Sequence, residues 1–308
     1  MTHLLHLDAS ARPGLAGKDE HGSHSRNLSQ RFVSQWLERR PQDGVTYRDI
    51  GQNPPSFVSH DWIASAFTPE ELQQPWMKDA LAESDRLVDE LLAADVLVIG
   101  TPLYNFGMPA ALKAWIDQVV RLNRTVGLDE SNPLDPYVPM LADRERHAVI
   151  LTARGGVGFG PGGAMAHMNH LEPNLATALG FIGITRIHQI AIEGQEVGGE
   201  LLANSVAEAL RQVAALVTEL QSTIAAPRPA SASARPKRAS EPVWRPDDAS
   251  EAAFGRRDWA EHPAHWGDTE PTSLSPACPW ALQCRLCRTA PEPPCSPSPI
   301  WKPRRRKR

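Results

Sequence analysis

Short apolar runs alternate with amphipathic stretches along residues 1–220, and this alternation restricts the chain to few architectures. The apolar runs are predicted strands, at Leu4–Asp8, Val45–Ile50, Asp95–Ile99, His147–Thr152 and Thr185–Ile192. Apolar residues recur with helical spacing in the segments Ser25–Arg39, Met77–Leu92, Pro109–Val119, Leu171–Leu179 and Glu200–Leu220. Strands that alternate with helices predict βαβ units, in which right-handed crossovers place helices on both sides of a parallel sheet.

Five such strands fit a flavodoxin-like α/β fold, a three-layer sandwich with a parallel sheet of strand order 2-1-3-4-5. In this type of sheet, ligands bind outside the carboxyl ends of the strands, at the switch point between strands 1 and 3. The loops after strands 1, 3 and 4 should therefore carry unusual residues, and the three loops described below do.

The composition divides the chain near residue 226. Residues 227–308 hold 15 of the 28 prolines, all four cysteines and a net charge of +6, whereas residues 1–226 carry a net charge of −10. We expect a folded domain over 1–226 and a disordered Pro/Arg-rich tail over 227–308, because the tail has too few aliphatic residues to bury. The cysteines of the tail give one CxxC pair, which does not predict structural zinc, at Cys278, Cys284, Cys287 and Cys295. The terminal KPRRRKR is expected to be a solvated charged end.

Several classes of protein are not expected from this sequence. The start, MTHLLHLDAS, has no basic region followed by an apolar core, and no run of about 18 apolar residues could span a membrane. The sequence pI near 6.3 gives no reason to expect a nucleic-acid partner. Residues 1–226 contain no cysteine, which fits a reducing compartment. We expect a soluble, cytoplasmic protein.

The loop after the first strand suits an anion. Ser10 follows the end of the strand, and Ser23 and Ser25 flank His24 directly before a predicted helix. A helix N-terminus offers unpaired N–H groups and partial positive charge, to which hydroxyls and the guanidinium of Arg26 could add. The alternative is that Ser23 or Ser25 is only an N-cap. No metal is expected here, because no carboxylate or cysteine recurs near the histidines at ligand spacing.

The loop after the third strand reads GTPLYNFGMP and starts at Gly100. It places Tyr104, Asn105 and Phe106 between two glycines, where loops are usually short and polar. Such aromatics need a flat surface to pack on. The alternative is an aromatic plug over the end of the sheet.

The loop after the fourth strand reads TARGGVGFGPGG. Gly155 and Gly156 permit a positive φ and a close approach of the backbone to a ligand, and the alternative is a flexible surface loop. Taken together, the three loops suit one phosphate, one planar ring and the far edge of that ring. Flavin mononucleotide (FMN) has these parts, so the sequence predicts an FMN site.

These segments resemble the FMN-dependent NAD(P)H:quinone oxidoreductases, also called azoreductases, which have a flavodoxin-like fold. The similarity spans about Leu4 to Leu220 and is densest in TPLYNFGMPAALKAWIDQVVR, LTARGG and LEPNLATALGFIGIT. The resemblance implies a set of FMN-binding residues: Ser10, Ser23, His24, Ser25, Pro102, Leu103, Tyr104, Asn105, Phe106, Ala153, Arg154, Gly155 and Gly156. Ala153 stands where the family commonly has Ser, so one hydroxyl contact is missing.

The resemblance also implies a homodimer in which the segment Asn53–Pro75 covers a neighbouring site. The expected activity is transfer of hydride from NADH or NADPH through tightly bound FMN to a quinone or azo acceptor, in a ping-pong cycle. No catalytic side chain is assigned. Two alternatives remain: a flavodoxin-type electron carrier without a substrate pocket, and an interaction protein that acts through its basic tail.

Overall fold

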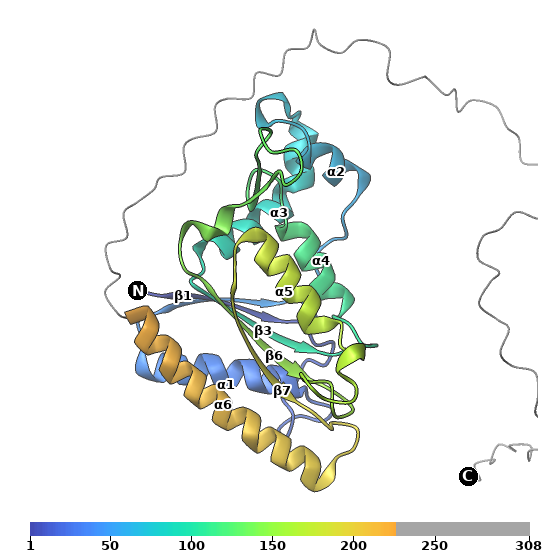
Figure 1. The fold of residues 1–308 in the computed structure, drawn as a ribbon, viewed down its shortest axis with the longest axis vertical. Helices are drawn as coiled ribbons and strands as arrows, with labels where there is room; N and C mark the ends of the chain where they lie inside the picture. The colour runs from blue at the N-terminus through green and yellow to red at the C-terminus, as the bar shows by residue number, and fades with distance from the viewer. Residues whose placement is uncertain (226–308) are drawn as a thin grey trace, which may run out of the picture. The chain divides into compact units, whose positions relative to one another are not determined.

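A computed structural model describes residues 1–225 of the chain (Figure 1). The predicted tail over 227–308, with its cysteines and basic end, lies outside the described residues. Within the part that is described, no helix is both long and apolar enough to cross a membrane.

The central sheet has five parallel strands in the order β2-β1-β3-β6-β7, which confirms the predicted flavodoxin-like topology. Its strands are β1 (His3–Asp8), β2 (Gly44–Asp49), β3 (Val96–Pro102), β6 (His147–Ala153) and β7 (Arg186–Ile192). Every residue of β3 and β6 is buried, because helices cover both faces of these two inner strands. Both strands run past their predicted ends, at Ile99 and Thr152, so that Pro102 and Ala153 belong to the sheet.

The helices form two layers, one on each face of the sheet, as Figure 1 shows. One layer consists of α1 (His24–Arg39) and α6 (Gly199–Ala225), and the other of α3 (Pro75–Ala93), α4 (Ala110–Val119) and α5 (Leu171–Ile182). Pro109, predicted as the first residue of this helix, is the N-cap of α4, one position before the helix begins at Ala110.

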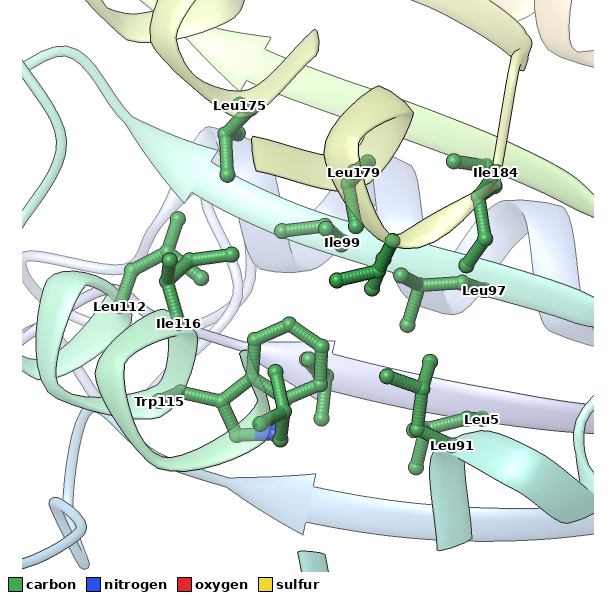
Figure 2. Close-up of a cluster of buried hydrophobic side chains, with 14 of the residues drawn as sticks. Leu5, Leu91, Leu97, Ile99, Leu112, Trp115, Ile116, Leu175, Leu179 and Ile184 are labelled. Atoms are coloured by element: carbon green, nitrogen blue, oxygen red, sulfur yellow. The ribbon is translucent and has the colours of Figure 1, made fainter. Parts of the chain in front are cut away.

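Each helical layer packs on the sheet through its own apolar cluster. Leu28, Phe32 and Trp36 of α1 meet Val213 and Val217 of α6 over one face. The other cluster is drawn in Figure 2, and its labelled side chains come from the sheet, from α3, α4 and α5, and from the connection between α5 and β7: Leu5, Leu91, Leu97, Ile99, Leu112, Trp115, Ile116, Leu175, Leu179 and Ile184. Burial of both faces fixes the sheet, and with it the position of the loops at its carboxyl edge.

Two parts of the structure were not expected from the sequence. The segment Asn53–Pro75, for which no helix was predicted, contains a helix, α2 (His60–Ala66), capped by Ser59, and a turn of 3₁₀-helix at Glu70–Leu72. After α4, a small antiparallel pair forms from β4 (Val126–Leu128) and β5 (Tyr137–Pro139). Two further 3₁₀ turns lie at Met140–Asp143 and Ala166–Met168.

Candidate cofactor site at the carboxyl edge of the sheet

The loops after β1, β3 and β6 lie at the same edge of the sheet and are joined by backbone hydrogen bonds. Ala9 N–H donates to the carbonyl of Gly100 at 2.8 Å, and Leu103 N–H donates to the carbonyl of Ala153 at 2.9 Å. His170 N–H donates to the carbonyl of Phe106 at 2.8 Å. The three loops predicted to act together are therefore neighbours in the fold.

The serines of the first loop are buried at the start of α1. Ser23 is the N-cap, and its Oγ accepts from Arg26 N–H at 3.3 Å and lies 3.0 Å from Ser25 Oγ. Ser10 is only 1% exposed, and its Oγ accepts from Arg12 N–H at 3.2 Å. The N–H groups of His24 and Ser25 have no partner among residues 1–225. Ser23 is thus an N-cap, as the alternative held, and it also borders two free donors that suit an anion.

His24 and Arg12 set the charge near these donors. His24 Nδ1 is buried and has no hydrogen-bond partner among the described residues. Burial, together with the positive charge of Arg12, lowers the pKa of His24, so its imidazole is neutral near pH 7. Arg12 is exposed and was not singled out from the sequence. Its charge is close enough to lower the pKa of His24, so Arg12 lies near these donors.

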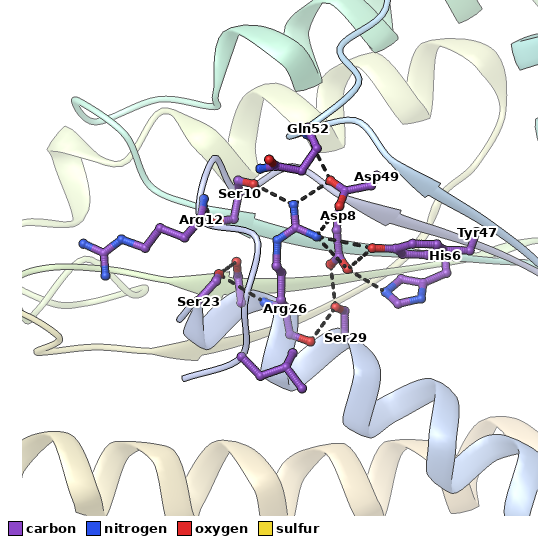
Figure 3. Close-up of polar contacts among 12 residues, drawn as sticks. His6, Asp8, Ser10, Arg12, Ser23, Arg26, Ser29, Tyr47, Asp49 and Gln52 are labelled. Atoms are coloured by element: carbon purple, nitrogen blue, oxygen red, sulfur yellow. Dashed lines mark hydrogen bonds and ion pairs between the residues drawn. The ribbon is translucent and has the colours of Figure 1, made fainter. Parts of the chain in front are cut away.

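Arg26 does not contribute its charge to this anion site, contrary to the sequence-based expectation. Its side chain is buried, 2% exposed, and points to the end of β2 rather than to the start of α1 (Figure 3). Arg26 Nη1 donates to Asp49 at 2.8 Å and lies 3.6 Å from Asp8. Two carboxylates at the ends of adjacent strands therefore hold this guanidinium.

The loop after β3 is a tight turn in a costly conformation. Tyr104 and Gly107 exchange backbone hydrogen bonds of 3.0 and 2.9 Å across Asn105 and Phe106, whose φ angles are 46° and 67°. A positive φ is unfavourable for residues other than Gly, particularly for a bulky one such as Phe, and such strain concentrates at functional sites. Tyr104 and Phe106 are 38% and 43% exposed, so they do not plug the end of the sheet.

The loop after β6 approaches its surroundings closely, but not through the predicted backbone conformation. Neither Gly155 nor Gly156 has a positive φ. A Cβ on Gly155 would lie 2.7 Å from the side chain of Glu196, and a Cβ on Gly156 would lie 3.2 Å from Phe159. Gly156 is thus favoured by close packing against Phe159 rather than by a left-handed turn, whereas the exposed Glu196 side chain could move away from a Cβ on Gly155.

Glu193, at the end of β7, braces this loop and was not identified from the sequence. Its carboxylate accepts from the N–H groups of Gly158 and Phe159, at 2.8 and 2.9 Å, and from Arg154 Nη1 at 2.8 Å. Burial acts to raise its pKa, but these hydrogen bonds outweigh burial and lower it, so the carboxylate stays charged. Arg154 is also paired with buried Glu172, which leaves its side chain occupied within the protein.

The contacts of Glu193 also affect the turn after β3. The rings of Phe159 and Phe106 are neighbours, with centroids 6.3 Å apart. Because Glu193 fixes the backbone of Phe159, it also supports one side of the exposed aromatic turn.

Two cavities within residues 1–225 lie away from this edge of the sheet. One of about 550 Å³ lies between α1 and α6, and one of about 220 Å³ lies between α2, α3 and the segment after α4. None of the predicted FMN-binding residues lines either cavity. Neither cavity is part of the candidate site, which is formed by loops at the edge of the sheet. Residues 1–225 contain no cluster of three His, Cys, Asp or Glu side chains that could hold a metal ion.

Comparison with known proteins agrees with this geometry. Residues 2–217 match the family model described as "Flavodoxin-like fold". The chain is 46% identical over 217 residues to FMN-dependent NAD(P)H:quinone oxidoreductase 1 of Pseudomonas aeruginosa, covering 70% of this chain and 98% of that protein. It is 41% identical over 220 residues to FMN-dependent NADH:quinone oxidoreductase 2 of Idiomarina loihiensis, covering 71% and 91%. The crystal structure of an azoreductase from Bacillus anthracis superposes with a TM-score of 0.61, at 26% identity, covering 71% of this chain and all of that one.

Proposed function

The chain belongs to the flavodoxin-like family of FMN-dependent NADH:quinone oxidoreductases, and we propose that the loops after β1, β3 and β6 bind one FMN. The observation that carries this assignment is the juxtaposition of two unlike surfaces at one edge of the sheet. Free helix N–H groups with buried serines lie on one side, and exposed aromatics on a strained turn lie on the other.

The phosphate of FMN binds at the start of α1. The N–H groups of His24 and Ser25 and the hydroxyls of Ser10 and Ser25 donate to its oxygens, while Ser23 donates to Ser25 Oγ and orients it. The positive end of the α1 dipole favours the charge of the phosphate. Arg12 adds a cation at the solvent side. Neutral His24 contributes its backbone rather than a charge.

The isoalloxazine ring lies against the other two loops. Pro102, Leu103, Tyr104, Asn105 and Phe106 form the bed of the ring and contact the ribityl chain, and the exposed faces of Tyr104 and Phe106 supply apolar area. At the pyrimidine end of the ring, the contacts come from the backbone of Ala153, Arg154, Gly155 and Gly156. Since Ala153 lies in the strand and the Arg154 side chain pairs with Glu172 and Glu193, neither provides a side-chain hydrogen bond to the ring.

The protein is an oxidoreductase that uses NADH or NADPH to reduce quinones and azo compounds. FMN held by these loops would supply the redox chemistry, which is uptake of hydride from the nicotinamide and transfer of two electrons to the acceptor. The residues of this chain bind and orient the FMN, and no side chain is assigned to proton transfer. The names of the relatives favour this enzyme over an electron carrier of flavodoxin type.

A homodimer remains a proposal, supported by exposed apolar side chains around α2 and β5. Phe57 and Phe67 flank α2 and are 75% and 69% exposed, and Tyr137 in β5 is 53% exposed. Large exposed apolar groups gathered on one part of a surface mark sites of association. The segment Asn53–Pro75 would then face the partner, and Phe67→Asp should shift the sedimentation of the protein toward that of a monomer. A cytoplasmic location likewise stays a prediction.

Steady-state kinetics test the proposed activity. The purified full-length chain, supplied with FMN, should oxidise NADH continuously with a simple quinone as acceptor and with no partner protein. Double-reciprocal plots at several quinone concentrations should be parallel, as a ping-pong cycle requires. Oxidation that begins only when a partner redox protein is added would instead indicate a carrier.

A further inference from the structure

We propose that Arg26 is a positioning residue that fixes Ser10 for the FMN phosphate, although it does not touch the phosphate itself. The proposal rests on the proposed FMN site. The sequence suggested that the Arg26 guanidinium would contact the anion directly. The position of the side chain instead gives Arg26 an indirect role in holding Ser10.

Arg26 connects three segments that meet behind the phosphate loop (Figure 3). Its Nη2 donates to the backbone carbonyl of Ser10 at 2.7 Å, and the same guanidinium bonds both carboxylate oxygens of Asp49 at the end of β2. Asp8, at the end of β1, lies 3.6 Å from Nη1. The fork of a guanidinium suits such a bidentate contact, which fixes orientation as well as position.

The hydrogen bonds at Ser10 leave its hydroxyl proton free. Ser10 Oγ accepts from Arg12 N–H at 3.2 Å, so the hydroxyl can still donate toward the start of α1. Gly51 packs closely against the Ser10 carbonyl, since a Cβ at this position would lie 2.1 Å from that oxygen. Arg26 therefore determines the direction in which the Ser10 side chain leaves the sheet.

The carboxylates behind the loop give Arg26 a second effect on an anion. Asp8 and Asp49 would place two negative charges next to the phosphate site, and Arg26 neutralises part of that field. Ser29 and Tyr47 each donate a hydroxyl proton to Asp8, at 2.7 and 3.1 Å, and these neutral donors do not compensate its charge. Loss of Arg26 should thus weaken the binding of a phosphate more than the binding of an uncharged ligand.

Riboflavin, which lacks the phosphate, separates this role from a general effect on folding. Apoprotein is titrated with FMN and with riboflavin, and the ratio of the two dissociation constants is compared for wild type, Arg26→Lys and Asp49→Asn. Lys keeps the charge without the fork, and Asn frees the guanidinium without altering Arg26 itself. We expect FMN binding to weaken about tenfold or more in Arg26→Lys, the effect of losing roughly one hydrogen bond to a charged group, with riboflavin binding unchanged. Asp49→Asn should also weaken FMN binding, but less, because it removes one of the two negative charges behind the loop as well as the bidentate contact.

Arg31→Gln serves as the matched control, because it removes a cation from an exposed position of the same helix and should leave the ratio unchanged. Thermal unfolding of each apoprotein checks that it is folded. If Arg26→Lys does not fold, Asp49→Asn decides the question, since the Asp49 side chain is 21% exposed and its loss is better tolerated.

An unchanged preference for FMN over riboflavin in a folded Asp49→Asn or Arg26→Lys protein would overturn the proposal. Equal weakening of both flavins would also overturn it, because that result indicates a merely structural role. Failure of wild type to bind either flavin would instead contradict the FMN site itself, so the two failures are distinguishable.

Discussion

The two halves of the candidate site are built in different ways. On the phosphate side, Ser10, Ser23 and Ser25 are buried and hydrogen-bonded, and Arg26 ties the loop to the ends of β1 and β2. On the ring side, Tyr104 and Phe106 project into solvent from a turn with two positive φ angles. The residues of the phosphate side are thus packed into the domain and hydrogen-bonded to it, whereas the aromatic residues of the ring side are exposed on its surface.

This difference predicts that mutations on the two sides will have different consequences. Buried polar groups with fixed partners couple stability to binding, because their loss leaves partners unsatisfied. Exposed side chains on a strained turn contribute little to stability and are available for a ligand. Mutations of buried polar groups, on the phosphate side or at Glu193 behind the ring side, should therefore lower stability, whereas mutations of the exposed turn should lower FMN affinity alone.

The largest effect is expected from Glu193→Ala, which removes the brace of the ring side. The variant leaves the N–H groups of Gly158 and Phe159 and the guanidinium of Arg154 without their shared acceptor. Breaking a half-buried ion pair with such hydrogen bonds should lower the free energy of unfolding by about 3 kcal/mol, measured by urea denaturation. Glu196→Ala removes an exposed carboxylate three positions along and should have little effect. Equal stability of the two variants would show that Glu193 is no brace.

Ser25→Ala tests the phosphate side. The loss of a hydrogen bond from a buried hydroxyl to a charged phosphate should raise the FMN dissociation constant by roughly 10- to 100-fold. Quenching of FMN fluorescence on binding measures this change. Ser34→Ala, on the exposed face of the same helix, should bind FMN as wild type does. Wild-type affinity in Ser25→Ala would remove this serine from the site.

Phe106→Gly should separate binding from stability on the ring side. Glycine relieves the positive φ of 67°, so the apoprotein should unfold at the same temperature as wild type or higher. FMN affinity should fall about fivefold, or about 1 kcal/mol, because an aromatic contact is lost. Phe106→Ala is the matched control, since it loses the ring but keeps the strain. It should bind FMN as weakly as the Gly variant and be about 1 kcal/mol less stable; equal stabilities would argue against strain in the turn.

The smallest effect on stability is expected from a histidine mutation at the opposite edge of the sheet. His147 and His188, near the amino ends of β6 and β7, lie 3.3 Å apart, and burial lowers the pKa of both. Below about pH 6.5, the ordinary pKa of histidine, the unfolded chain takes up protons that the folded protein does not, so stability should decrease as the pH falls. His188→Gln should flatten this dependence, with and without FMN. A profile that changes on adding FMN would place the effect at the cofactor site instead.

The sequence predicted the fold well because strand and helix patterns here are long and mutually consistent. The buried runs Val96–Ile99 and His147–Thr152 can only be inner strands, and their order places the loops that follow them. Shorter elements had no such pattern. Helix α2 has seven residues, and β4 and β5 have three each, so tertiary contacts decide their conformation.

Side-chain partners in the site were less accessible to sequence reasoning. Arg26 follows Ser25 directly and so looked like a phosphate ligand, but Asp8 and Asp49 reach it from two strand ends distant in sequence. Glu193 was missed because its partners lie in another loop, 34 and 35 positions away. A carboxylate directly after a predicted strand at the ligand edge was the available signal.

The central claim is that three loops at one edge of the sheet hold a single FMN that NADH can reduce. The most direct test is the visible absorption spectrum of the purified protein with added FMN, after gel filtration, before and after NADH is added without oxygen. The account predicts a yellow protein that retains about one FMN per chain and bleaches with NADH. A colourless protein that retains no flavin would contradict it.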